Sequence, residues 1–162
     1  MVEGQTVQIQ MVDNSDKVRK AFAANLEKAL TICGGTAEGY AKDEINGDYG
    51  SPRRVDTGLL HNSITYGLAG ESPNIGQYSG DRPRSAGGAV PSGSYSGTLP
   101  ADNSEHVSSA YVGTNVEYAP YIHEGFDLPS GGHVSPNRFI RNALGNNVDK
   151  YKGIIEKALS EI

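Results

Sequence analysis

One short stretch of the sequence carries residues of a catalytic type. Asp56-Thr57-Gly58 matches the triplet of aspartic proteases, in which two such loops meet and their carboxylates share a proton. A single copy would serve that chemistry in a homodimer, so a homodimeric aspartic protease using Asp56 is one hypothesis. The flanking residues argue against it, because protease loops lie between strongly apolar strands, whereas Arg53-Arg54 precedes this triplet and Leu59-Leu60 follows it. Asp and Thr are also favoured helix caps, so the triplet equally predicts the start of a helix.

Histidine and acidic residues offer a second kind of chemistry, metal binding. His123-Glu124, together with Glu117 and His133, brings suitable ligand types into one region. The zincin pattern needs two histidines one helical turn apart, and the sequence does not contain it. A glycine-rich stretch before a Lys-Ser/Thr pair and a serine nucleophile elbow are also missing from the sequence. We therefore predict no catalytic residue, no metal and no cofactor, and we expect a non-enzymatic protein.

The composition restricts the class of protein. A chain of 162 residues, 36% hydrophobic and 20% charged, fits a single domain spanning residues 1–162. Its net charge of −5 argues against a protein whose main task is binding nucleic acid, because such a protein needs a concentrated basic surface. We expect no membrane helix, which needs roughly 18 apolar residues in a run, and no secretory signal. The single cysteine, Cys33, cannot form an intrachain disulfide, which fits assembly in a reducing cytoplasm.

Periodic hydrophobic residues predict the elements of the first half of the chain. Val7, Ile9 and Met11 alternate with polar residues, which predicts a strand over residues 5–12. Apolar residues then recur every three or four positions, which predicts a helix over residues 15–33. Gly34-Gly35 weakens the pattern beyond it, but Ala37, Tyr40 and Ala41 could extend the helix past the glycines. A turn-rich connector at 46–54 leads to a short helix capped by Asp56 or Thr57.

The second half of the chain shows alternating strand and helix signals. We expect strands at 64–68 and 109–113, a single helical turn at 118–123 and a loop at 126–135. Ser135-Pro136 predicts the start of a last helix that runs to the terminus, with proline at its first position. Two long helices packed on a small antiparallel sheet make an α+β fold.

Residues 69–107 have a different composition from the rest of the chain. They are dense in Gly, Ser and Pro with few aliphatic side chains, which predicts a long loop excursion between two strands. By hypothesis this excursion becomes ordered against a neighbouring subunit. The alternative is a binding module in which it recognises a partner through Tyr78, Arg82, Arg84 and Tyr95. Its charges nearly balance, which favours protein contacts over phosphate contacts.

Three segments carry motifs that are more specific than these patterns. Residues 56–64 hold Thr-Gly followed by a leucine and a Ser-Ile pair. Residues 111–125 hold Val-Gly-Thr, Tyr-Ala and an aromatic-x-x-Glu-x-Gly run, and residues 136–143 hold Pro-x-Arg-Phe-hydrophobic-Arg-x-Ala. In this order they resemble the tail-completion (neck, or head–tail joining) proteins of long-tailed bacteriophages. The resemblance covers the chain except residues 69–107, which exceed the corresponding connection in that family.

The resemblance implies a structural role in the virion, in its neck or tail, assembled in the host bacterial cytoplasm. The chain would form a homo-oligomeric ring, a hexamer by the sixfold symmetry of tails. That ring would join a head-side connector or stopper protein to the tail terminator or tail tube protein. DNA would pass through its bore without sequence-specific binding. A tail terminator, a head stopper or another minor completion protein is the alternative within the same class.

The motifs also supply candidate residues for the subunit interface. Aromatic side chains give large contact area at modest entropy cost, which suits both cores and interfaces, and both interpretations stay open. Arginines at the start of a helix are disfavoured by the helix dipole, which favours a carboxylate partner for them. The candidates are Tyr118, Tyr121, Glu124, Arg138, Phe139 and Arg141.

Overall fold

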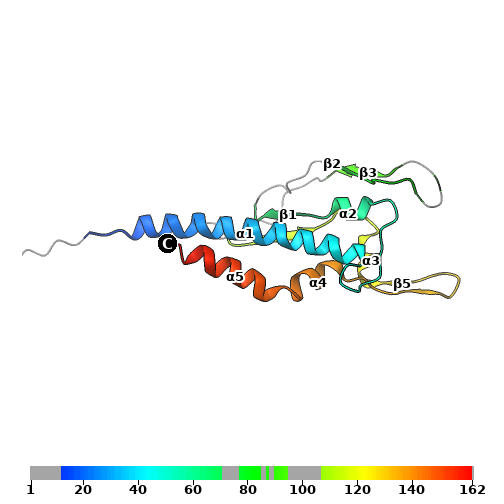
Figure 1. Cartoon of the computed structure of the whole chain (residues 1–162). Coiled ribbons are helices and arrows are strands. Elements are labelled where there is room, and N and C mark those ends of the chain that lie inside the picture. Colours follow the sequence, from blue (N-terminus) through cyan, green and yellow to red (C-terminus); the bar gives the residue numbers. More distant parts are fainter. Residues whose placement is uncertain (1–11, 71–76, 85–86, 88–89, 95–106, 162) are drawn as a thin grey trace, which may run out of the picture.

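The chain has an α+β architecture, as its sequence predicts. The computed structural model describes residues 12–70, 77–84, 87, 90–94 and 107–161 (Figure 1). The described elements, in chain order, are α1 (Ser15–Asn46), α2 (Leu59–Ser63), β1 (Thr65–Leu68), β2 (Gln77–Ser79), β3 (Ser92–Ser94), β4 (Ala110–Gly113), α3 (Ala119–Glu124), β5 (Phe126–Asp127), β6 (His133–Val134), α4 (Phe139–Gly145) and α5 (Val148–Leu159).

The long helix α1 is the central element of the fold. It lies between α4 and α5 on one side and the strand β1 with α2 on the other (Figure 1). The α5 helix runs back along α1: the Cys33 thiol contacts the carbonyl of Tyr151 at 3.8 Å, and the Asn25 amide donates to the carbonyl of Ala158 at 3.1 Å. The first turns of α1 are exposed, with Val18 at 54% and Phe22 at 45% of full exposure.

The first helix is longer than the predicted span of residues 15–33. The helix α1 continues past Gly34-Gly35 to Asn46, where Gly47 terminates it in a left-handed conformation with φ of 87°. Glycine at position 34 serves packing, because a Cβ there would lie 2.4 Å from Cδ2 of Tyr66 in β1. The glycine that weakens the helical pattern is therefore the residue that lets the sheet approach the helix.

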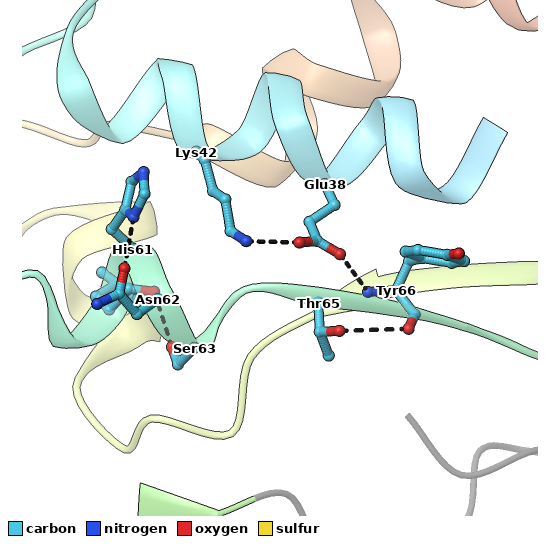
Figure 2. A network of polar contacts seen from close by, with 8 residues as sticks. Glu38, Lys42, His61, Asn62, Ser63, Thr65 and Tyr66 are labelled. Carbon is cyan, nitrogen blue, oxygen red and sulfur yellow. Dashed lines mark hydrogen bonds and ion pairs between the residues drawn. The ribbon is translucent and has the colours of Figure 1, made fainter. Parts of the chain in front are cut away.

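The sheet that packs against α1 pairs β1 with β4 in antiparallel fashion. These are the strands predicted at 64–68 and 109–113, and Tyr66 lies opposite Val112. Figure 2 shows the edge of β1 that faces away from β4: the amide of Tyr66 donates to Oε2 of Glu38 at 3.2 Å, and Lys42 pairs with Oε1 of the same carboxylate. Of the strand predicted at 5–12, residues 5–11 lie outside the described residues.

The connections carry more strands than the sequence predicts. The β2 and β3 strands pair within the segment 69–107, much of which lies outside the described residues, and β5 pairs with β6 in the predicted 126–135 loop. The predicted short helix and helical turn are confirmed as α2 and α3. The α2 N-cap is Gly58 rather than Asp56 or Thr57, although the Thr57 hydroxyl accepts a hydrogen bond from the amide of Leu59 at 3.2 Å.

The last helix differs from the prediction at two points. It begins at Phe139 rather than at Pro136, because the amides of Asn137 and Arg138 donate to carbonyls of α3 and hold the chain out of a helix. It is also divided into α4 and α5 at Asn146 and Asn147. The side-chain amide of Asn147 donates to the carbonyl of Ala143 at 3.0 Å, which occupies a carbonyl at the end of α4.

Candidate functional site

The three segments that carry the family-like motifs meet in one core. Each contributes two residues to the main buried cluster, and the C-terminal half of α1 contributes the rest. A hydrogen bond of 2.6 Å between the hydroxyls of Ser63 and Thr114 ties the first segment to the second. The cluster consists of Ala41, Ile45, Leu60, Ile64, Val116, Ala119, Phe139 and Ala143.

The junction between α3 and α4 fixes the positions of the charged candidates. The amides of Asn137 and Arg138 donate to the carbonyls of Ile122 and His123, each at 3.0 Å, and so satisfy the open end of α3. Arg138 takes a left-handed conformation with φ of 53°, the one positive φ among the described residues other than glycine. This turn directs the chain into α4 beside α3.

A carboxylate, an imidazole and an arginine lie together at this junction. His123 Nδ1 and Oε1 of Glu124 are 2.7 Å apart, and Arg141 Nη2 is 3.6 Å from the same oxygen. The amide of Arg141 also donates to His123 Nε2 at 3.4 Å, so the imidazole ring contacts both Glu124 and the backbone of α4. The hydrogen bond between His123 and Glu124 is the main cause that lowers the pKa of Glu124, and the charges of Arg141 and Arg138 lower it further.

The aromatic candidates occupy three different environments. Tyr121 is 62% exposed and packs edge-on against Phe126 of β5, with ring centroids 6.3 Å apart. Phe139 is fully buried, and its ring packs edge-on against that of His123 with centroids 5.2 Å apart, so it is a core residue. Tyr118 is 42% exposed on the side of α3 that faces Leu60, and burial raises the pKa of its hydroxyl.

Of the six candidates, the structure therefore brings three together. Glu124, Arg138 and Arg141 form an exposed charged cluster at the α3–α4 junction, with Tyr121 exposed on the same short helix. Tyr118 lines a separate hollow, and Phe139 supports the cluster from inside the core. The carboxylate partner predicted for an arginine near the helix start is confirmed for Arg141.

The protease-like triplet forms a turn that holds the β2–β3 segment. Gly58 has φ of 86°, and a Cβ there would lie 2.1 Å from Oδ1 of Asp81. The carbonyl of Thr57 accepts hydrogen bonds from the amides of Asp81 and Arg82 at 2.7 and 3.2 Å. Through residues 12–70, no strand precedes the triplet and α2 follows it, unlike the two strands that flank a protease loop. The contacts of Thr57 and Gly58 with Asp81 and Arg82 thus give these two residues of the triplet a structural role.

The residues considered for a metal site lie in separate contacts. His123 is bonded to Glu124, whereas His133 is bonded to Asp127 with 2.7 Å between Nδ1 and Oδ1. Among the residues that the structure describes, no group of three or more His, Cys, Asp or Glu side chains could hold a metal ion. Across this same part of the chain, no helix is long and apolar enough to cross a membrane.

Sequence reasoning missed the asparagines that connect the elements. Asn137 is 2% exposed and donates to the carbonyls of Glu44 at 3.1 Å and Pro52 at 2.8 Å. Asn62 donates to the carbonyl of Ser79 at 2.7 Å, and Asn115 donates to that of Ser94 at 2.7 Å while accepting from the Tyr78 hydroxyl. The type and spacing of these residues give no signal, because their partners are distant in sequence.

Comparison with known proteins returns no relative. No family model matches the chain, and no curated protein and no solved structure matches it. The resemblance of the three motif segments to a known family therefore stays a prediction from the sequence, and the structure adds that these segments lie in one core.

Proposed function

We propose that this chain is a structural subunit of a phage neck ring that joins the head-side connector to the tail. The observation that carries the proposal is the convergence of the three family-like segments in one core, with charged and aromatic side chains of the same segments exposed at the α3–α4 junction.

The exposed part of these motifs has the chemistry of a protein contact. Tyr121 presents an aromatic ring that is 62% exposed, and Glu124 and Arg141 have side chains that are 55% and 62% exposed. Aromatic rings and arginines are enriched where protein surfaces bind each other. Complementary charges at the rim of such a contact select the neighbour rather than add much affinity.

The mechanism of such a ring is mechanical. Each subunit presents one surface to its neighbour on one side and a different surface to its neighbour on the other, so that the contacts close into a ring. Six copies are expected from the symmetry of tails. The net charge of −5 gives the bore little attraction for phosphate, so that DNA passes without being held.

Assembly of the purified protein tests the ring. Native mass spectrometry should show six copies of the 17.2 kDa chain, and Tyr121→Ser should shift the population toward monomer without lowering the melting temperature. Tyr49→Ser is the matched control, because Tyr49 has a similar exposure, 56%, and lies outside the three motif segments. Equal loss of assembly in both variants would contradict a specific role for Tyr121.

A charge exchange separates contacts within a subunit from contacts between subunits. The double variant E124R/R141E keeps an ion pair inside the subunit but reverses the charges that a neighbour meets. We expect it to fold like the wild type and to assemble less well at low salt. Normal assembly of the double variant would show that this pair serves its own subunit alone.

A further inference from the structure

One edge of β4 is not paired with any other strand that the structure describes, and it is called the free edge here. The amide of Ala69 donates to the carbonyl of Ser109 at 3.0 Å, which extends the β1–β4 ladder by one pair. Because hydrogen-bonded pairs alternate in an antiparallel ladder, Tyr111 and Gly113 bond to β1 whereas Ala110 and Val112 point their backbone groups away from it. Within the described part of the chain, no other strand pairs with this edge of β4.

The opposite edge of the same sheet is covered at Tyr66. The outward amide of Tyr66 in β1 donates to the Glu38 carboxylate, and Glu38 is held in place by Lys42 (Figure 2). A side chain that occupies an edge amide blocks the addition of another strand there. The β4 edge has no such cover from the described residues, and a sheet of two strands is marginal in stability.

An apolar groove adjoins the free edge. Its wall on the β4 side includes Tyr111, which is 39% exposed, and on the α4 side Leu144, which is 44% exposed. The α1 and α5 helices supply the lining on the other side, from Leu30, Cys33, Gly34, Ala37, Tyr151 and Ile155. A strand that paired with β4 would therefore place one of its two faces on apolar side chains.

The chain itself contains a segment of matching pattern. Residues 5–11 read Gln-Thr-Val-Gln-Ile-Gln-Met, so that Val7, Ile9 and Met11 share one face of a strand and Gln8 and Gln10 the other. The apolar face would enter the groove, and the glutamines would face outward. We propose that residues 5–11 of a second copy of this chain add a strand to the free edge of β4.

The donor is a second copy because of where the segment starts. The groove lies beside residues 30–37 of α1, at least about 22 Å from the helix start at the helical rise of 1.5 Å per residue. Residues 12–14 continue past that start, away from the groove (Figure 1), with Asp13 accepting a hydrogen bond from the amide of Ser15 at 2.9 Å. To enter the groove of its own subunit, the preceding segment would have to reverse its direction and run back along α1, whereas the groove of a neighbouring subunit requires no such reversal.

Strand exchange of this kind gives the proposed ring a directional contact. One subunit gives its N-terminal segment and receives another at β4, which is a head-to-tail interface of the kind that closes into rings. The identity of the second copy as a ring neighbour rests on the proposed function, whereas the contact between two copies does not.

Cysteine cross-linking tests the exchange directly. Cys33 is the only cysteine of the chain and lines the groove, so V7C, I9C and M11C each create one possible disulfide with it. Burial raises the pKa of the Cys33 thiol, so the oxidation is run at alkaline pH. We expect disulfide-linked dimers and longer ladders on non-reducing gels for these variants, and little linkage for Q8C and Q10C on the opposite face.

Three outcomes would overturn the proposed contact, and a fourth would overturn only the neck role. A faster-migrating linked monomer would show that the segment folds onto its own subunit. Equal linkage at the glutamine and apolar positions would show that no strand is formed. Adding Cys33→Ser must abolish the ladder, or the linkage does not involve the groove. Linked dimers from a protein whose deletion leaves heads and tails joined would keep the contact and reject the neck role.

Discussion

Gly34 of α1 lies directly against the ring of Tyr66 in β1. A Cβ at position 34 would be 2.4 Å from Cδ2 and 2.9 Å from Cγ of that ring, closer than atoms can pack. The same strand residue gives its amide to Glu38, one helical turn further along α1. Together these two contacts set the distance and the register between the long helix and the sheet.

Gly34→Ala should therefore destabilise the protein. The clash involves the base of the Tyr66 ring, which cannot move without shifting β1, and overpacking of this kind costs about 1–3 kcal/mol. Gly39→Ala is the control, since a Cβ there meets nothing within 4 Å and should stabilise α1 by about 0.5–1 kcal/mol. Urea unfolding followed by circular dichroism measures both. If the contact is responsible, Gly34→Ala loses its penalty in a Tyr66→Ala background.

Asn137 should be among the most sensitive positions of the third motif. Its side-chain amide donates to the carbonyls of Glu44 and Pro52, and it connects α4 to the end of α1 and to the following connector. Asn137→Ala leaves these acceptors without their donor and should cost about 2–4 kcal/mol. Asn137→Asp should cost more, because it turns a carboxylate toward two carbonyls. Equal unfolding midpoints for the two variants would contradict this account, and Asn146→Ala, at an exposed position, serves as the control.

Alanine substitution at Gly58 should have a larger effect than the same substitution at Gly70, a glycine of the same backbone conformation. Gly58 and Gly70 have φ of 86° and 79°, but only Gly58 would place a Cβ against Asp81. Alanine at either position brings the strain of a left-handed conformation, about 1–2 kcal/mol. Gly58→Ala should additionally speed hydrogen exchange of the Asp81 and Arg82 amides, which donate to Thr57. Unchanged exchange at these amides would mean that the turn does not hold the β2–β3 segment.

The carboxyl of Glu124 should titrate below its ordinary pKa of 4.5. Because the folded-state pKa is lowered, the interaction contributes fully above the unfolded pKa and is lost as the pH falls through the folded value. Carbon-detected NMR gives the titration directly. His123→Phe keeps a ring against Phe139 but removes the hydrogen bond, and should raise the pKa of Glu124 more than Arg141→Ala does. The reverse order would make the arginine the main cause.

The sequence allowed the α+β class and most elements to be predicted, because their hydrophobic periodicity is local. It failed at Gly34, where the residue that weakens a helix is required by a ring from another element. It failed at Pro136 because the following two amides bond to α3, a contact that no local pattern shows. The break at Asn146 and Asn147 had a local signal, since Gly145 and two asparagines are poor helix formers.

The candidate interface was predictable in part for similar reasons. The dipole argument anticipated a carboxylate near the arginines, and Glu124 occupies that place beside Arg141. Periodicity could not show that Phe139 is buried while Tyr121 is exposed, because both follow the same spacing rules and differ only in tertiary packing. The free edge of β4 could not be predicted from the sequence, because it depends on which strands pair in the folded chain.

Electron microscopy of particles from cells lacking this protein tests the neck role most directly. The account predicts filled heads lying beside separate, complete tails, with joining restored when the wild-type protein is supplied. Normally joined particles in the absence of the protein would contradict the account.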